Sequence, residues 1–356
     1  MRGHQEEMER HMSMQRIIYF DVLRIVAVFA VVALHVCSRR FIVTFPSTEW
    51  EVLNVYDSLT RWGVPVFVMI SGALFLDEKK DFSIKRLYRE NVVRIICAFV
   101  CWSFVSQLTK IDSHTTVDSF VQGCIEGPFH LWFLKMLLGL YVVVPILRRV
   151  VQDRKTELYF LMIALLTAFL LPLIPQVLLF CDPALSLRAE ELIDSFFLNI
   201  ATGYTGYFVL GHFLHHTIVK RNMRRMVYVL GFVSAISVMV LTSKGSHDLG
   251  GPTEMFYHYL TPFTLFEAAA VFLFFSERFR NRDVKRVEWV VNLSKLTFGI
   301  YLVHPIFIKL PDVLWGINSS VAAPWFIPVF SCGVFAVSLC VTWGISKIPV
   351  ANKYVI

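Results

Sequence analysis

Long apolar runs alternate with short polar segments along almost the whole chain. Most runs reach the roughly 17–25 residues that a helix needs to cross the hydrocarbon of a bilayer. The runs cover residues 17–37, 59–76, 92–109, 130–147, 157–180, 195–214, 226–243, 259–277, 291–310 and 325–346. This pattern predicts an all-α, polytopic integral membrane protein with about ten transmembrane helices. An even number of spans places both termini on the same side of the membrane.

Composition agrees with this pattern and leaves room for one membrane domain. Of the 356 residues, 56% are hydrophobic and 17% are charged, whereas soluble domains carry about 25% charged residues. We expect a membrane domain over residues 17–346, a disordered cytoplasmic tail over 1–16 and a short cytoplasmic tail over 347–356. Residues 1–16 lack the apolar core of a signal peptide, so the first run is expected to be an uncleaved anchor.

The distribution of basic residues predicts the orientation of the spans. With cytoplasmic termini, most of the 34 Lys and Arg residues fall in inner segments. The outer segments then hold only Arg39, Arg40, Arg61, Lys110, Arg188, Lys244 and Lys309. This is the positive-inside distribution. The net charge of +7 therefore reflects topology and gives no indication of nucleic-acid binding. Membrane lipids are the expected partners of the apolar surface.

Three ionisable residues lie on one stripe of the first apolar run. Helical residues advance by about 100° each, so His35 falls within about 20° of Arg24, and Asp21 within about 60° of both. A charge at the bilayer centre costs on the order of 2.5–3.5 kcal/mol, so it usually faces a protein cavity and has a function. In the alternative interpretation, Asp21 and Arg24 reach the inner interface and His35 lies at the outer one.

Further polar and aromatic side chains interrupt later runs. The candidates for a cavity are His130, Trp132, Lys135, Glu267, Tyr301 and His304. Glu267 is the strongest of them, because it sits in the middle of the apolar stretch FTLFEAAAVFLFF. Trp132 also fits the aromatic belt found at membrane interfaces.

The most basic inner segment, residues 77–94, has an amphipathic pattern suited to the membrane surface. Arg86 and Arg89 are three residues apart and share a helix face, with Arg94 further along. Because Arg presents a planar donor fork to phosphate, these residues are candidates for binding a phosphorylated cofactor. Ordinary positive-inside charge in contact with lipid headgroups explains the segment equally well.

The seven cysteines form no C-x-x-C pair, and no spacing indicates a metal site. Cys124 and Cys181 both fall in predicted outer loops, so a disulfide between them is left open.

Several segments, in order along the chain, resemble the acyltransferase-3 family of bacterial membrane acyltransferases. The first span, YFDVLRIVAVFAVVALH, is similar to the family's opening motif, and VPVFVMISGALF to its Pro-x-Phe-Phe-x-x-Ser-Gly segment. The run KRLYR resembles its Arg-x-x-Arg pair. Its fourth, sixth and ninth spans are matched by HLWFLKMLLGLYVVVPIL, YTGYFVLGHFL and FGIYLVHPIFI.

The opening motif also departs from the commoner family pattern. Val22 and Ile25 replace two glycines, a form that resembles the branch acting on cell-envelope sugars and antigens. Lys135 stands where an aromatic residue is frequent.

The resemblance implies a ten-helix domain and specific roles for the residues above. His35 and Arg24, with Asp21 beside them, map to the essential histidine and arginine of the family. Arg86 and Arg89 map to an arginine pair that handles the acyl-coenzyme. The implied protein lies in the bacterial cytoplasmic membrane, with homo-oligomerisation left open.

The implied activity is O-acyl transfer from cytoplasmic acetyl-CoA, or another acyl-CoA, to a hydroxyl of an envelope sugar, polysaccharide or lipid-linked glycan. No metal is expected. In this interpretation His35 is the general base, Arg24 holds the donor, and His304 or Glu267 orients His35. The alternative is a transporter or exporter of glycans, for which inverted repeats would be the signature.

Overall fold

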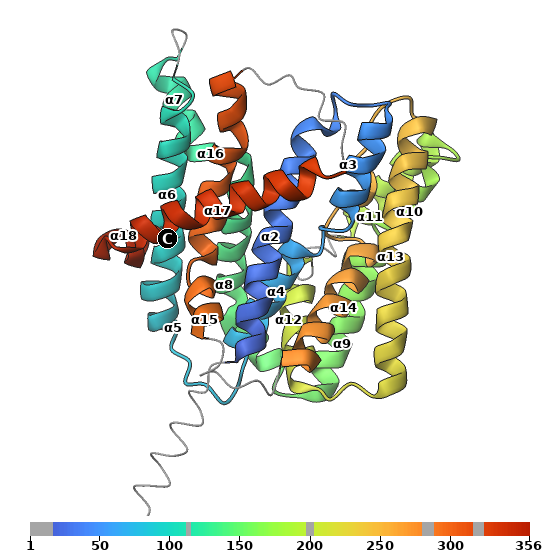
Figure 1. The fold of residues 1–356 in the computed structure, drawn as a ribbon. Coiled ribbons are helices and arrows are strands. Elements are labelled where there is room, and N and C mark those ends of the chain that lie inside the picture. Colours follow the sequence, from blue (N-terminus) through green and yellow to red (C-terminus); the bar gives the residue numbers. More distant parts are fainter. Residues whose placement is uncertain (1–16, 112–114, 197–202, 280–287, 316–323) are drawn as a thin grey trace, which may run out of the picture.

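The computed structural model describes residues 17–111, 115–196, 203–279, 288–315 and 324–356, without the side chains of 311–315. Within these ranges every regular element is a helix (Figure 1). The prediction of an all-α fold is therefore confirmed for the described part of the chain.

The helices follow the predicted apolar runs. The first half contains α2 (Ile18–Phe41), α3 (Thr48–Ser58), α4 (Gly63–Phe75), α5 (Ile84–Arg86), η1 (Leu87–Val92), α6 (Val93–Leu108), α7 (Val117–Glu126), η2 (Phe129–Leu131) and α8 (Trp132–Val150). The second half contains α9 (Arg154–Ala164), η3 (Leu165–Leu170), α10 (Leu173–Leu178), α11 (Pro183–Ser195), α12 (Tyr204–His216), α13 (Arg221–Asp248), η5 (Met255–Tyr257), α14 (Pro262–Phe279), α15 (Glu288–Ser294), α16 (Thr297–Trp315), α17 (Phe326–Ser346) and α18 (Pro349–Tyr354).

Eight helical stretches of the described chain are long and apolar enough to cross a membrane, and a bent pair raises the number to nine. The bent pair is Glu288–Ser294 with Thr297–Leu310, which meet at 57°. The predicted sixth span, 195–214, lies partly outside the described residues, and only α12 of 13 residues represents it. The number ten therefore stays a prediction.

Helix α2 lies at the centre of the bundle. It contacts α3, α4, α14, α15, α16 and α17. Figure 1 shows α6 and α7 on one side of the bundle, α13 on the other, and α17 running obliquely across it. The helix with the ionisable stripe is thus surrounded by protein, as expected where charges at membrane depth need polar partners.

Two glycines bring α4 and α12 into close contact. A Cβ added at Gly72 would lie 1.8 Å from the Phe208 carbonyl oxygen, and one at Gly211 would lie 2.0 Å from that of Met69. Such distances are only compatible with glycine, since small residues let helix backbones approach in membranes. Gly72 of the second predicted span is therefore required for this helix packing.

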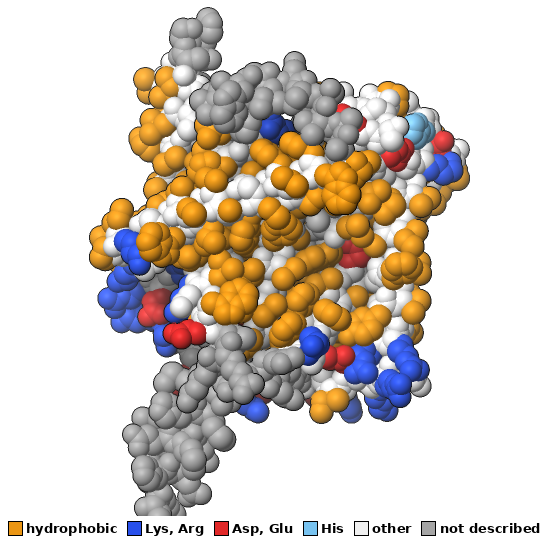
Figure 2. All heavy atoms as spheres, viewed as in Figure 1, with side chains coloured by type: hydrophobic (Ala, Val, Ile, Leu, Met, Phe, Trp, Pro, Cys, Tyr) orange, Lys and Arg blue, Asp and Glu red, His pale blue; other side chains and the backbone are white. Residues whose placement is uncertain are grey.

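Basic side chains gather at one end of the bundle, which we call the basic end. Arg148, Arg154, Arg224 and Arg278 lie at helix termini there. Figure 2 shows hydrophobic side chains across the middle of one face, with many of the Lys and Arg side chains towards one end. This asymmetry agrees with the predicted inner side, and the orientation in the membrane stays a prediction. The opposite end is called the far end below.

The last residues of the described chain are packed. Helix α18 contacts α6 and α17. The Trp102 indole Nε1 donates a hydrogen bond to the Val355 carbonyl oxygen at 3.1 Å. Residues 347–356, expected to be a short tail, thus form part of the folded domain.

All seven cysteines lie in the described residues, and all are free. The disulfide left open between Cys124 and Cys181 is not formed.

Candidate active site

Two histidines from different helices form a hydrogen-bonded pair at the core of the bundle. His35 Nδ1 lies 2.8 Å from His304 Nε2, and the two ring planes differ by only 18°. His304 is completely buried, whereas His35 is half-buried. Helices α2 and α16, which contact each other, bring together residues far apart in the sequence.

The partners of His304 determine which nitrogen atoms carry protons in the neutral pair. His304 Nδ1 lies 2.6 Å from the Tyr301 carbonyl oxygen, which can only accept a hydrogen bond. Its Nδ1 therefore carries the proton, and its Nε2 accepts from His35 Nδ1–H. This leaves the lone pair of His35 on Nε2. The arrangement follows the general rule that a hydrogen bond at one ring nitrogen fixes the state of the other.

His130, Tyr301 and Phe129 complete the surroundings of the pair. The Tyr301 hydroxyl donates to the His130 carbonyl oxygen, which ties α16 to η2. The His130 ring centroid lies 6.0 Å from that of His304. The edge of Phe129 meets His35 with 5.2 Å between ring centroids. Four of the predicted site residues, His35, His130, Tyr301 and His304, are thus brought together.

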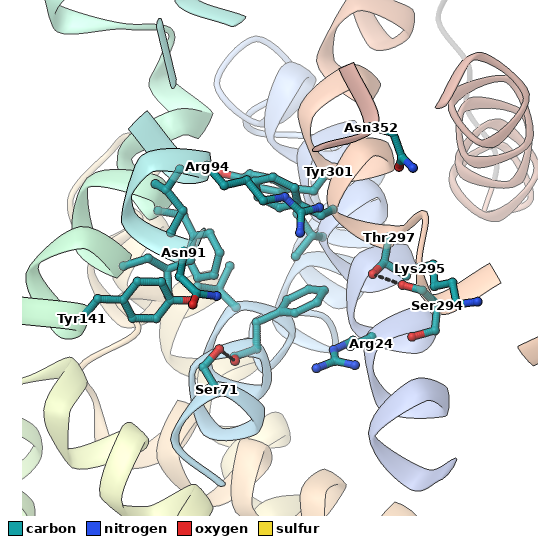
Figure 3. A pocket seen from close by; sticks show the side chains of 17 residues that line it. Arg24, Ser71, Asn91, Arg94, Tyr141, Ser294, Lys295, Thr297, Tyr301 and Asn352 are labelled. Atoms are coloured by element: carbon teal, nitrogen blue, oxygen red, sulfur yellow. Dashed lines mark hydrogen bonds between the residues drawn. The ribbon is translucent and has the colours of Figure 1, made fainter. Parts of the chain in front are cut away.

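A pocket of about 500 Å³ reaches this cluster from the direction of the basic end. We call it the Arg24 pocket. It is lined by Arg24, Val31, Val64, Phe67, Ser71, Asn91, Arg94, Ile95, Phe133, Leu137, Tyr141, Ser294, Lys295, Thr297, Phe298, Tyr301 and Asn352 (Figure 3). Val31 and Tyr301 lie about one helical turn before His35 and His304, respectively. One end of the pocket is therefore next to the histidine pair.

The Arg24 pocket is lined by three cations and no carboxylate among its described residues: Arg24, Arg94 and Lys295. Arg24 forms an ion pair with the buried Asp21 at 3.6 Å. The Ser294 hydroxyl donates to the same carboxylate at 2.6 Å. Asp21 thus joins the first span to α15 and holds Arg24 at the pocket wall.

The arginine pair Arg86 and Arg89 lies outside this pocket. Both side chains are exposed, and Arg86 forms an ion pair with Glu90 at 2.9 Å. Only Arg94, of the three arginines predicted to bind a cofactor, lines the pocket. Lys295, which sequence reasoning assigned only to the edge of a span, lines it as well. Its position becomes apparent only when α15 is placed beside α2.

Trp132 and Lys135 point to different surroundings although they are one turn apart. The Trp132 ring stacks on Tyr259 at a centroid distance of 5.5 Å and an angle of 24°. Lys135 is exposed and donates to the Glu126 carbonyl oxygen at 3.1 Å. Lys135 is thus not brought together with the histidines, whereas Trp132 belongs to an aromatic cluster within the bundle.

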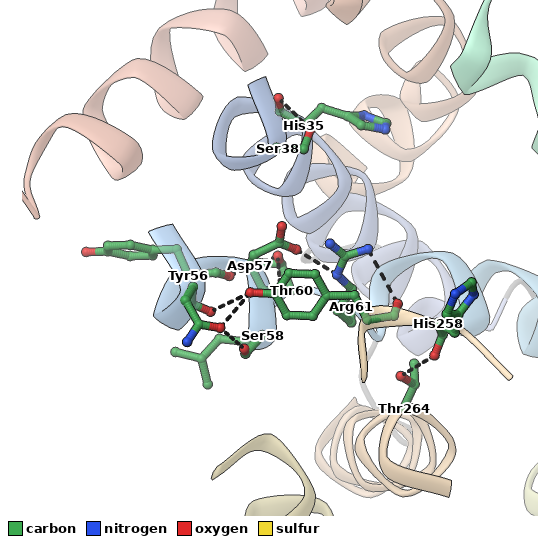
Figure 4. A network of polar contacts seen from close by, with 12 residues as sticks. His35, Ser38, Tyr56, Asp57, Ser58, Thr60, Arg61, His258 and Thr264 are labelled. Atoms are coloured by element: carbon green, nitrogen blue, oxygen red, sulfur yellow. Dashed lines mark hydrogen bonds and ion pairs between the residues drawn. The ribbon is translucent and has the colours of Figure 1, made fainter. Parts of the chain in front are cut away.

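An ion pair missed by sequence reasoning lies near His35. Arg61 and Asp57, four residues apart, are both buried, with 2.7 Å between Arg61 Nε and Asp57 Oδ1 (Figure 4). The Arg61 guanidinium also lies 4.0 Å from the centroid of the Tyr257 ring. The i, i+4 spacing of Asp57 and Arg61 is a sequence signal for this pair, although the charge distribution alone assigns Arg61 to an outer segment.

Glu267 is buried without a hydrogen-bond partner among the described residues. Its side chain is 4% exposed, and neither carboxylate oxygen has such a partner. Arg61 is its electrostatic neighbour. Buried polar groups in folded proteins almost always have hydrogen-bond partners, so Glu267 is a candidate for a functional role.

A second cavity, of about 570 Å³, lies towards the far end, and we call it the Glu190 cavity. It is lined by Thr167, Ala168, Pro172, Pro175, Gln176, Leu179, Ser186, Glu190, Ile193, Asp194, Gly203, Met255, His258 and Leu260. Its lining contains two carboxylates and one histidine, but no Lys or Arg among the described residues. None of the sequence-predicted site residues lines it.

Within the described ranges, no group of three or more His, Cys, Asp or Glu side chains is arranged to hold a metal ion.

Comparison with known proteins identifies the family. The profile of the acyltransferase-3 family, described as an acyltransferase domain, matches residues 17–345, nearly the whole chain. No curated protein and no solved structure matches significantly. The profile covers both helices of the histidine pair and all of the Arg24 pocket except Asn352. The chain therefore belongs to the acyltransferase-3 family of membrane acyltransferases.

Proposed function

We propose that this protein moves an acyl group, most simply acetyl, from acyl-CoA in the Arg24 pocket to a hydroxyl of an envelope carbohydrate. The observation that carries the proposal is the His35–His304 hydrogen bond directly beyond a pocket lined by cations. The positive-inside rule makes the basic end cytoplasmic, where acyl-CoA is found. A bacterial cytoplasmic membrane and a glycan or lipid-linked sugar acceptor fit this arrangement.

The charge of the Arg24 pocket supports the donor. Acyl-CoA carries its phosphates far from its thioester, which sits at the end of a flexible arm. Arg24 and His35 are eleven residues apart on α2, or about 16 Å along the helix axis. Phosphates held near Arg24, Arg94 and Lys295 would leave the arm free to extend past Tyr301 towards His35. Arg and Lys are both established phosphate ligands in proteins.

The histidine pair supports the chemistry. In the proposed step, His35 Nε2 accepts the proton of the acceptor hydroxyl while the hydroxyl oxygen attacks the thioester carbonyl carbon. The C–S bond then breaks, and the coenzyme thiolate takes the proton back from His35 Nε2. The His35 Nδ1–H bond to His304 orients the imidazole and stabilises its cation. A positioned base of this kind contributes about 10²–10⁴-fold in rate.

Variants of His304 test this role without removing the base. In His304→Gln, the amide oxygen can still accept from His35 Nδ1–H, whereas His304→Leu offers no acceptor. We expect acetyl transfer to fall in the order wild type, His304→Gln, His304→Leu. The measurement is consumption of radiolabelled acetyl-CoA by purified protein in nanodiscs, supplied with envelope glycans.

Folding is checked separately by membrane insertion and by thermal unfolding of each variant. Equal rates for His304→Leu and the wild type would contradict the proposed orientation of His35. Mass spectrometry of envelope glycans, with and without the protein, then identifies the acceptor.

A further inference from the structure

The last residues of the described chain contribute to the wall of the Arg24 pocket. Helix α18 contacts α6, and Figure 1 shows the two side by side. The Arg94 guanidinium on α6 donates a hydrogen bond to the Ile356 carbonyl oxygen. The Ile356 side chain is buried, and its Cβ lies 3.2 Å from the place that a Cβ at Gly299 on α16 would take. These contacts anchor the segment against α6 and α16, and Asn352 of the same segment lines the pocket (Figure 3).

This part of the wall lies outside the residues that the family profile matches. The profile ends at residue 345, and Asn352 is a lining residue beyond it. The features shared by the family therefore do not account for the presence of Asn352 in the pocket.

Two of the lining side chains, Asn91 from η1 and Asn352 from α18, are amides. Within the described chain, neither amide group has a hydrogen-bond partner. By contrast, the Ser71 and Thr297 hydroxyls donate to the carbonyl oxygens of Phe67 and Ser294 within their own helices or at their ends, at 2.9 and 2.8 Å. An Asn amide has a carbonyl oxygen that accepts and an amino group that donates two hydrogen bonds. Asn91 and Asn352 thus have unused donors and acceptors available to a ligand in the pocket.

Resting on the proposed function, we propose that Asn91 and Asn352 bind the amide groups of the pantetheine arm of acyl-CoA. The arm joins the phosphates to the thioester, and it contains two secondary amides, each with one N–H and one carbonyl oxygen. An Asn side chain suits such a group because it can donate to the carbonyl oxygen and accept from the N–H. The arm extends from the cations of the Arg24 pocket past Tyr301, so it runs along the wall that these asparagines line.

The pocket lining then recognises two different parts of one donor. The cations Arg24, Arg94 and Lys295 bind the phosphates, and the two asparagines bind the uncharged arm. Removing a cation should weaken binding only for donors that carry phosphates. Removing an asparagine should weaken binding for every donor that carries the arm.

The experiment compares acetyl-CoA with S-acetylpantetheine, which has the same arm and thioester but no phosphate. We measure kcat/KM from the release of free thiol, using the full chain in nanodiscs with saturating envelope glycan. Asn352→Leu keeps the size of the side chain and removes the amide, so kcat/KM should fall about fivefold for both donors, as for one neutral hydrogen bond. Asn91→Leu should have the same effect. Lys295→Gln should lower only the value for acetyl-CoA.

The matched control is Lys353→Leu. Lys353 follows Asn352 on α18, is exposed and is not among the residues that line the pocket. Its replacement should leave both kcat/KM values unchanged. Thermal unfolding of each variant checks folding, and Asn91→Ala or Asn352→Ala removes the amide where Leu lowers the unfolding temperature.

Three kinetic outcomes would overturn the proposal. The first is an unchanged kcat/KM for both donors in either asparagine variant. The second is a fall confined to acetyl-CoA, which would place the asparagine against the nucleotide instead of the arm. The third is an equal fall in Lys353→Leu, which would indicate a general disturbance of α18.

Binding of pantetheine alone separates this proposal from the proposed acyl transfer. Saturation-transfer NMR on the same nanodiscs detects this binding without any reaction. Loss of the pantetheine signal in the double variant Asn91→Leu, Asn352→Leu would support the amide site even if the wild type consumed no acetyl-CoA, a result that would refute the acyl transfer. Absence of the signal in the wild type would overturn the amide site, whereas consumption of acetyl-CoA would still support the acyl transfer.

Discussion

The two cavities of this protein have similar volumes, about 500 Å³ and 570 Å³, but opposite charge. The Arg24 pocket is lined by Arg24, Arg94 and Lys295 and ends one turn from the histidine pair. The larger Glu190 cavity is lined by Glu190 and Asp194. Volume alone would select the Glu190 cavity, whereas the proposed site is the Arg24 pocket. What distinguishes a site is the convergence of charged and hydrogen-bonding groups on a place where a reacting atom can sit.

A short segment of backbone separates the Glu190 cavity from the residues around Arg61. Met255, His258 and Leu260 line the cavity. Tyr257 and Tyr259, from the same segment, instead contact Arg61 and Trp132. Alternate residues of one segment thus face two environments. The backbone of this segment therefore lies between a ligand in the Glu190 cavity and the side chains of Tyr257 and Tyr259.

The largest expected difference between the two regions concerns their histidines. His35→Ala should lower acetyl transfer by about 10²–10⁴-fold, because the proposed base is lost while insertion is retained. His258→Ala changes an exposed histidine of the Glu190 cavity and should leave the rate unchanged. Both rates are measured as acetyl-CoA consumption in nanodiscs. Near-normal activity of His35→Ala would show that the histidine pair is not the active site. A large loss of activity in His258→Ala would indicate that the active site lies in the Glu190 cavity.

The cations of the Arg24 pocket give the next largest effect. Lys295→Gln should raise the KM for acetyl-CoA about tenfold, as for the loss of one charge-assisted hydrogen bond, with kcat nearly unchanged. The double variant Arg86→Gln, Arg89→Gln removes exposed charge outside the pocket and should change this KM less. A larger rise in the double variant would mean that the donor phosphates extend to the surface segment, as the family resemblance implies.

Glu267 provides an intermediate effect. Glu277 is a matched control, because it pairs with Arg224 at 2.7 Å near the basic end, where an exposed pair contributes little. We expect Glu267→Gln to lower acetyl transfer by more than Glu277→Gln does, since Arg61 interacts electrostatically with both the buried Glu267 and His35. The amide preserves size, so the comparison isolates charge. Equal rates in the two variants would make Glu267 a tolerated structural carboxyl.

The sequence alone could single out those residues of the candidate site that follow from the cost of charge in a membrane. His35, Arg24 and His304 interrupt apolar runs, so each could be selected from a single helix. Pairing between His35 and His304 could not be predicted, because it depends on which helices are neighbours. For the same reason, the sequence could not show that Lys295 lines the Arg24 pocket whereas Arg86 and Arg89, the candidates for cofactor binding, lie outside it. The helical bend at 57° before α16 also leaves no clear trace in hydropathy.

The smallest effect is expected where the larger cavity is altered. The double variant Glu190→Gln, Asp194→Asn removes both lining carboxylates while preserving their size. Both side chains are exposed, so their loss should change thermal unfolding little. Because the cavity lies behind the segment of Met255 to Leu260, the KM values for donor and acceptor should both stay within about twofold of the wild type. A rise in the acceptor KM alone, with the donor KM unchanged, would instead assign the acceptor to the Glu190 cavity.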